Sequence, residues 1–165
     1  MEQQTLSSVT IRPITAADDP FIAKIIRTNF EQYHLNIPGT AYFDPQLDHL
    51  SAYYAQNGRG YFVAVDENGT VLGGCGFAEF PTFARCAELQ KLYLADRAKG
   101  KHVGRRLSET VEQAAKDAGY EKLYLETHSL LDAAIRLYEK LGFRPIPKPQ
   151  GVQHDTMDRF YLKSL

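Results

Sequence analysis

The most informative stretch of this chain reads Lys99-Gly100-Lys101-His102-Val103-Gly104-Arg105-Arg106-Leu107. We call residues 99–106 the basic loop, because five of these eight residues are basic or histidine. The loop joins a strand-like run ending at Leu94 to an amphipathic helix predicted from the apolar spacing. Cations are unfavourable at a helix start, where the backbone already carries about half a unit of positive charge. Free N–H groups, glycines and cations together favour a bound phosphate, with a solvated basic turn as the alternative.

The residues before the basic loop predict short strands and two helices. Apolar runs and alternation indicate strands over residues 9–14, 61–65, 71–80 and 86–94. Asn68-Gly69 indicates a hairpin turn between two of these strands, because both residues tolerate positive φ. One helix is predicted to begin near Pro20 and to reach Phe30, since its apolar residues follow helical spacing. A second helix is predicted over residues 44–54.

The residues after the basic loop predict an alternation of helices and strands. Gly119 and Gly142 are natural stops for helices that we expect over residues 103–118 and 130–141. Strands are expected over residues 122–127, 143–146 and 158–163. Hairpin strands followed by a strand–helix–strand–helix–strand run indicate a mixed α/β fold.

Composition limits the kinds of protein that this chain can be. Its 165 residues are enough for one domain with a single core. The net charge of −1 argues against a general nucleic-acid or membrane surface, so the basic loop favours a small anionic ligand. No run approaches the roughly 20 apolar residues of a membrane span. The polar stretch Met1–Ser8 lacks the apolar core of a signal peptide, so we expect a cytoplasmic protein.

The two cysteines and five histidines show no metal-ligand spacing, and no metal cofactor is expected. Cys75 and Cys86 lie on either side of a turn expected at Phe80-Pro81, so pairing across a hairpin is geometrically possible. In a cytoplasmic protein we expect two reduced, partly buried thiols instead.

Beyond these local patterns, the basic loop resembles the phosphate loop of the GNAT superfamily of acyl-CoA-dependent N-acyltransferases. The family's loop follows the pattern Gln/Arg-x-x-Gly-x-Gly/Ala. Its three marked positions fall on Lys99, His102 and Gly104. Only Gly104 matches strictly, while Lys99 keeps a positive charge and His102 replaces a glycine.

Two further stretches support the resemblance. Glu88-Leu89-Gln90-Lys91-Leu92-Tyr93-Leu94 resembles the strand that precedes the loop in many members. Leu137-Tyr138-Glu139-Lys140-Leu141-Gly142-Phe143 is very similar to the family's common L-Y-E-K-x-G-F ending. The resemblance is firm from about Tyr61 to Ile146 and looser elsewhere.

The resemblance implies an α/β (mixed α+β) fold and an acetyl-CoA cosubstrate. We expect a central, mostly antiparallel sheet of about six or seven strands, with one parallel splayed pair and about four flanking helices. Residues 1–8 are expected to form a flexible N-terminus and residues 9–165 the N-acetyltransferase domain. A non-catalytic acyl-CoA-binding sensor or regulatory module is the alternative, and a small nucleic-acid-binding protein is a weaker one.

Acetyl transfer to an amine needs a base, an acid and an anion site. An alkyl amine is mostly protonated at neutral pH, so a carboxylate must take its proton, and the leaving thiolate needs a proton donor. By resemblance, Glu88 is the candidate base and Tyr138 the candidate acid, with Glu79 as a rival base. Pantetheine would bind the backbone of Leu92, Tyr93 and Leu94. The pyrophosphate would bind Lys99, Gly100, Lys101, His102, Val103, Gly104 and Arg105.

The acceptor site is the least specified part of the sequence. By resemblance it lies between the early helices and the C-terminal hairpin, near Tyr33, His34, Tyr42, Phe43, Asp44, His154, Asp155 and Arg159. A small-molecule amine is our default acceptor, and a peptide amine remains open. Neither nucleic acid nor a membrane is expected as a partner, and a homodimer is one option. Many members carry an asparagine where this chain has Leu131.

Overall fold

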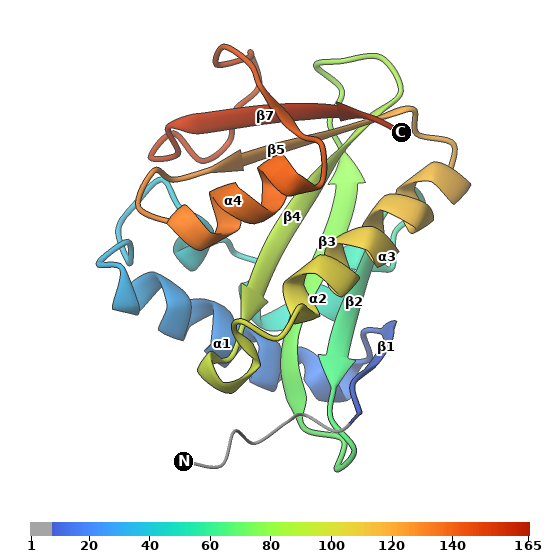
Figure 1. Ribbon diagram of the computed structural model, residues 1–165, viewed down its shortest axis with the longest axis vertical. Coiled ribbons are helices and arrows are strands. Elements are labelled where there is room, and N and C mark those ends of the chain that lie inside the picture. Colours follow the sequence, from blue (N-terminus) through green and yellow to red (C-terminus); the bar gives the residue numbers. More distant parts are fainter. Residues whose placement is uncertain (1–7) are drawn as a thin grey trace.

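The computed structural model describes residues 8–165 as a twisted sheet with helices on both faces (Figure 1). Within these residues the sheet has seven strands in the order β1-β2-β3-β4-β5-β7-β6. The strands are β1 (Thr10–Pro13), β2 (Gly60–Val65), β3 (Val71–Glu79), β4 (Cys86–Leu94), β5 (Lys122–Thr127), β6 (Arg144–Pro145) and β7 (Arg159–Ser164). All neighbouring strands are antiparallel except β4 and β5, which are parallel.

Four α-helices lie within the described residues: α1 (Asp19–Gln32), α2 (Leu50–Tyr54), α3 (Val103–Asp117) and α4 (Asp132–Lys140). The predicted fold, a mostly antiparallel sheet with one parallel pair and about four helices, is confirmed. The N-terminus predicted to be flexible lies outside the described residues, apart from Ser8.

The predicted helix over residues 44–54 is the main difference between sequence and structure. Only its second half is α-helical, and it follows two 3-10 turns, η2 (Ala41–Phe43) and η3 (Leu47–His49). Asp44 is extended, with φ −61° and ψ 129°. Pro45 explains this, because a residue before proline is sterically pushed out of the helical region. The prediction was wrong over residues 44–49.

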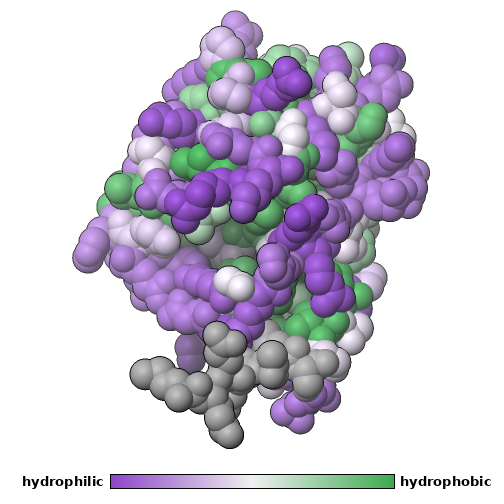
Figure 2. All heavy atoms as spheres, in the orientation of Figure 1, coloured by the Kyte–Doolittle hydropathy of each residue, from purple (hydrophilic) through white to green (hydrophobic). Residues whose placement is uncertain are grey.

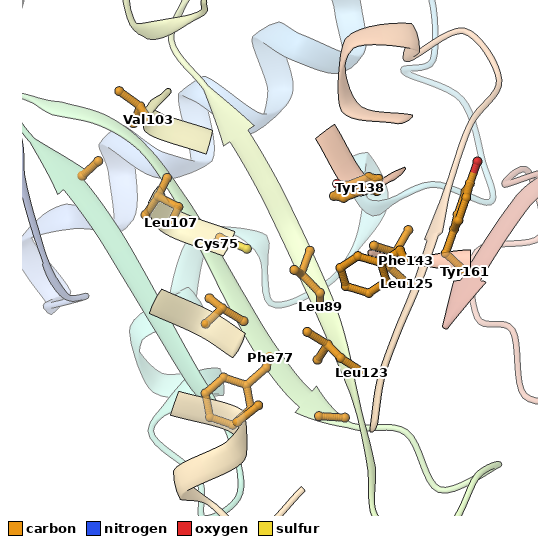
Figure 3. Packing of buried hydrophobic residues seen from close by; sticks show 14 of the residues in the cluster. Cys75, Phe77, Leu89, Val103, Leu107, Leu123, Leu125, Tyr138, Phe143 and Tyr161 are labelled. Carbon is orange, nitrogen blue, oxygen red and sulfur yellow. The ribbon is translucent and has the colours of Figure 1, made fainter. Parts of the chain in front are cut away.

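The two faces of the sheet carry separate hydrophobic cores. One face packs against α1 and α2 through residues such as Ile26, Leu50 and Tyr61. The other packs against α3 and α4, where Leu107 and Tyr138 contribute to the larger cluster (Figure 3). Burial of these apolar faces on both sides fixes which face each strand side chain occupies.

Strands β4 and β5 stay together for only a short distance. Their parallel pairing covers Cys86–Glu88 of β4 and Lys122–Tyr124 of β5. Beyond Glu88, β4 continues alone beside β3, and Figure 1 shows the two strands diverging. The register between β3 and β4 shifts between Gly74 and Gly76, which marks a β-bulge in β4.

Both cysteines are free and buried, so the expectation of unpaired thiols is confirmed and burial is deeper than expected. Burial raises the pKa of both thiols, which makes them unreactive as nucleophiles. Across residues 8–165, each helix is too short or too polar to cross a bilayer.

Candidate active site

The basic loop ends at the first turn of α3, where backbone N–H groups point outward. The first backbone hydrogen bond at this helix end runs from the N–H of Arg106 to the carbonyl of His102 over 3.1 Å. The N–H groups of Val103, Gly104 and Arg105 come before this first donor, so they have no acceptor within the helix. They form, with the positive end of the helix dipole, a site suited to an anion.

His102 shows why the family pattern has glycine at this position. It is the residue before α3 and adopts left-handed backbone angles, with φ 61° and ψ 12°. A residue with a side chain is disfavoured there, by roughly 1–2 kcal/mol. Gly100 also has a positive φ, of 74°, so the loop makes two tight turns before the helix.

The cations of the basic loop make exposed contacts that a ligand can replace. Nζ of Lys99 lies 2.9 Å from Oδ1 of Asp96, and Nε of Arg105 lies 2.9 Å from Oε1 of Glu109. Arg106 donates to the backbone carbonyl of Val9 over 3.0 Å. Exposed ion pairs of this kind contribute at most about 1 kcal/mol, so an anion at the helix end can compete with them.

A hollow opens beside the basic loop. Figure 2 shows it on the face where β4 passes between α4 and the start of α3, with hydrophobic side chains at its floor. Leu92 and Leu94 of β4 and Leu137 of α4 are each only partly buried. A Cβ added to Gly104 would lie 3.4 Å from Leu137 and 3.6 Å from Leu94, so this glycine faces the space between β4 and α4.

The bulge in β4 places polar side chains on the opposite face. Lys91 adopts a left-handed φ of 51°, and its carbonyl accepts a hydrogen bond from the buried hydroxyl of Tyr61 over 2.9 Å. An added Cβ at Gly74 would come within 2.4 Å of the Tyr61 ring, so the glycine makes room for it. The extra residue sends Gln90 and Lys91 to the same face, whereas Leu92 returns to the α3 side.

Tyr138 lies on the α3–α4 face of the sheet, beside the gap between the two diverging strands. Figure 3 shows its ring between β4 and β5, and its centroid is 5.9 Å from that of Phe143. Tyr138 is 6% exposed, and within residues 8–165 its hydroxyl makes no hydrogen bond. Among these residues no completely buried side-chain nitrogen or oxygen lacks a partner, so the hydroxyl oxygen of Tyr138 is not completely buried. Burial raises its pKa well above the usual value, so the group stays protonated.

Glu88 lies on the α1–α2 face at the last paired position of β4 and β5. Burial and, after it, the neighbouring charge of Glu126 together raise the pKa of its carboxyl to about 7. Gln90 donates a hydrogen bond of 2.7 Å to this carboxyl. A carboxyl that titrates near neutral pH is suited to accept and release protons.

The rival base, Glu79, has a different environment at the end of β3. Arg59 donates to both of its carboxylate oxygens, one of them over 2.9 Å. This guanidinium lowers the pKa of Glu79, and the Glu79 side chain is 47% exposed. A carboxylate neutralised in this way is a poor proton acceptor.

Five residues form a hydrogen-bonded group beside Glu88, which we call the acceptor-side cluster: Lys91, Asp44, His154, Glu126 and Tyr124. Lys91 lies 2.7 Å from Asp44, whose second oxygen lies 2.8 Å from Nε2 of His154. Nδ1 of His154 lies 3.3 Å from Glu126, which also accepts the hydroxyl of Tyr124 over 2.9 Å. Its two carboxylate partners outweigh burial and raise the pKa of His154 to about 9. His154 is therefore a cation at neutral pH.

The structure brings some of the expected acceptor residues together and not others. Asp44 and His154, 110 residues apart, are in direct contact. Tyr42 donates to Glu31 instead, and Tyr33 and Phe43 are exposed. Sequence reasoning missed Tyr54, Gln90, Lys91, Tyr124 and Glu126. The alternation of Glu88 and Gln90 along β4 was the one available signal.

A cavity of about 360 Å³ lies along α3, beside the end of α4 and the end of β7, and shares only Arg105 with the predicted site. Its lining is Arg105, Glu109, Glu112, Gln113, Lys116, Lys140, Leu141, Lys163 and Leu165. Lys163 and Glu112 pair within it at 2.8 Å, so we do not assign it a ligand. Among the described residues, no three His, Cys, Asp or Glu side chains are grouped to hold a metal ion.

Comparison with known proteins gives consistent matches. Residues 24–143 match the profile of the Acetyltransferase (GNAT) family. The uncharacterized N-acetyltransferase YjgM of Escherichia coli (strain K12) is 38% identical over 146 residues, which cover 87% of each chain. An acetyltransferase of GNAT family from Staphylococcus aureus Mu50 superposes with a TM-score of 0.81 at 18% identity, covering 96% of this chain and 99% of that one. The putative acetyltransferase yncA from Salmonella typhimurium, solved with its cofactor acetyl-CoA, superposes with a TM-score of 0.74 at 26% identity. This match covers 96% of this chain and 95% of that one.

Proposed function

This chain belongs to the acetyltransferase (GNAT) family and is an acyltransferase, and we propose that it moves an acetyl group from acetyl-CoA to a primary amine by direct attack. The observation that carries the proposal is the divergence of β4 and β5 beside two suitable groups. Glu88 lies at the fork with a pKa of about 7, and the protonated Tyr138 lies between the strands.

The residues present fit acetyl-CoA. The N–H groups of Val103, Gly104 and Arg105 supply donors for a pyrophosphate, with Lys99 and Arg105 as flanking cations. After Glu88 the edge of β4 that faces β5 is no longer paired, and this edge supplies backbone groups for the pantetheine arm around Leu92, Tyr93 and Leu94. The hollow in Figure 2 supplies an apolar floor for that arm. When bound, acetyl-CoA supplies the activated acetyl thioester.

In the proposed reaction the amine attacks from the face that carries Glu88. Glu88 takes the amine proton, directly or through water, and the nitrogen forms a bond to the carbonyl carbon of the thioester. The carbon–sulfur bond then breaks, and Tyr138 donates its proton to the leaving thiolate. Backbone N–H groups of β4 stabilise the oxyanion. Atoms and charges balance without a covalent enzyme intermediate.

The acceptor is proposed to be a small-molecule amine, with a peptide amine as the second class. The acceptor-side cluster holds two carboxylates against two cations, and Glu88 adds a third carboxylate. An ammonium group next to Glu88 balances this charge and lowers the pKa of the carboxyl towards ionisation. The second candidate function, a non-catalytic sensor of acyl-CoA, would use the basic loop without Glu88 and Tyr138.

Replacing Glu88 tests the proposal. We expect Glu88→Gln to lower kcat by about a hundredfold or more at neutral pH, since a positioned base contributes about that much. Acetyl-CoA affinity, measured by calorimetric titration, should stay within about twofold, because the substitution is remote from the basic loop. Thiol release with a panel of amines measures the rate. Glu79→Gln is the matched control, and a rate loss there instead of at Glu88 would contradict the assignment of the base.

A further inference from the structure

Two hydrogen bonds in series connect Glu88 to α2. Gln90 donates from Nε2 to Oε1 of Glu88 over 2.7 Å. The other end of the same amide, Oε1 of Gln90, accepts a hydrogen bond from the hydroxyl of Tyr54 over 2.7 Å. Glu88 and Gln90 are two residues apart on β4, so their side chains share the face that packs against α2.

Chemistry sets the direction of both bonds. An ionised carboxylate only accepts hydrogen bonds, so Gln90 must turn its NH₂ group towards Glu88. The amide oxygen then faces Tyr54, whose hydroxyl donates to it. Tyr54 is 3% exposed, and burial raises its pKa well above the usual value, so it keeps the proton that it donates. Tyr54 therefore selects the amide orientation that an ionised Glu88 requires.

The position of Tyr54 is itself set by packing. Its ring lies over Gly76, where an added Cβ would come within 3.2 Å of it. Gly76 is the cross-strand neighbour of Gln90, so the missing side chain lets the hydroxyl reach the amide. The ring also packs against Tyr61, with centroids 5.0 Å apart. The helix, the glycine and the second tyrosine together leave little freedom for the hydroxyl.

We propose that Gln90 and Tyr54 are positioning residues for the acetyl transfer. Tyr54 orients the amide of Gln90, and Gln90 holds the carboxylate of Glu88 in one place as an ionised proton acceptor. This inference rests on the proposed role of Glu88 as the base. Neither residue touches the reacting atoms, so each acts through Glu88.

The inference implies a measurable change in the titration of Glu88. Titratable groups face this carboxyl from four parts of the chain: Cys86 and Lys91 of β4, Tyr124 and Glu126 of β5, Tyr53 and Tyr54 of α2, and His154 of the loop before β7. Burial and Glu126 favour the neutral form, whereas Gln90, His154 and Lys91 favour the ionised form. Removal of the Gln90 donor therefore allows burial and Glu126 to raise the pKa of Glu88 further.

The test is a carboxyl ¹³C NMR titration of the glutamate-labelled full chain. The Glu88 resonance is identified by its absence in Glu88→Gln. We expect Gln90→Met, which keeps length and removes the amide, to raise the pKa of Glu88 by about one unit. Tyr54→Phe should raise it in the same direction, because the amide can then turn its oxygen towards the carboxyl. Unchanged titration in both variants would overturn the inference.

Tyr53→Phe is the matched control on the same helix. Arg59 lies over the ring of Tyr53, 4.4 Å from the ring centroid. Within residues 8–165 the hydroxyl of Tyr53 makes no hydrogen bond. Its substitution should leave the titration of Glu88 unchanged. An equal shift in Tyr53→Phe and Tyr54→Phe would show a general effect of helix α2 and would contradict the specific role of Tyr54.

Kinetics separate this inference from the proposed function. In Gln90→Met and Tyr54→Phe, the acidic limb of the pH–rate profile should move upward with the pKa of Glu88. The rate at about pH 9 should approach that of the wild type. If Glu88→Gln loses rate but the Glu88 titration is unchanged in Gln90→Met and Tyr54→Phe, only this inference is contradicted. An intact rate in Glu88→Gln contradicts the proposed function, whatever the titration shows.

Discussion

At the scale of single residues, Tyr138 and Glu88 occupy opposite sides of the sheet at one fork. Tyr138 belongs to the core on the α3–α4 face, and Glu88 faces α2. Between these two residues the pairing of β4 and β5 ends and the strands diverge. A thioester lying in the gap between the strands would be exposed to the proposed base on one side and the proposed acid on the other, which is the geometry that direct transfer needs.

Tyr138→Phe is predicted to separate turnover from binding. The substitution removes only a hydroxyl that, within the described residues, makes no hydrogen bond, so folding should be unaffected. We expect kcat to fall by about a hundredfold, as for loss of a general acid, and acetyl-CoA affinity to stay within about twofold. Tyr161→Phe, in the same hydrophobic cluster, is the control. Equal turnover in both variants would remove Tyr138 as the acid.

At the scale of elements, the first turn of α3 combines a structural role with the proposed role in binding acetyl-CoA. Val103, Leu107 and Val111 bury one side of the helix in the core. Gly104, one turn before Ser108, faces the hollow between Leu94 and Leu137. Glycine is a poor helix residue, so its presence there favours ligand approach over helix stability.

Gly104→Ala is predicted to move stability and binding in opposite directions. The added methyl meets only ordinary contacts, at 3.4 Å and 3.6 Å, and should stabilise the fold by about 0.5 kcal/mol. The same methyl narrows the hollow beside the N–H donors, but the family's loop pattern allows alanine at this position, so we expect acetyl-CoA affinity to fall by only about twofold. Urea unfolding and calorimetric titration measure the two effects. Lys116→Ala, near the far end of α3, should change neither by a comparable amount.

At the scale of the whole molecule, buried titratable groups link stability to pH. The folded-state pKa is raised to about 7 for Glu88 and to about 9 for His154, from usual values of 4.5 and 6.5. A group with a raised pKa stabilises the fold below its unfolded pKa and loses this contribution as pH rises through its folded pKa. Both groups therefore act in the same direction between about pH 5 and pH 9.

We predict that the free energy of unfolding falls by about 3 kcal/mol between about pH 5.5 and pH 8.5. The pKa shift of Glu88 or of His154 alone corresponds to about 3 kcal/mol. The two contributions do not add, because the two groups interact with each other. Urea unfolding at both pH values measures the change. His154→Gln should flatten the alkaline part of the curve, and a wild-type stability that is equal at both pH values would contradict the prediction.

Local patterns determined the elements, because they depend on residues that are near in sequence. The strand over Lys122–Thr127 follows from its own apolar residues, and α3 follows from helical spacing and Gly119. The candidate base, acid and basic loop followed from motifs of a few residues. The segment over residues 44–49 failed because the conformation imposed by Pro45 outweighed its helical pattern.

The sequence by itself therefore determined the strands, most of the helices and the family motifs of this protein. Only the tertiary structure decided what surrounds Glu88. Gln90 meets Tyr54 from 36 residues away, and His154 meets Asp44 from 110 residues away. These contacts exist because β7 pairs with β5 and α2 packs on the opposite side of β3 and β4 from α3. Long-range pairing and burial set such neighbours, and local sequence patterns carry no record of them.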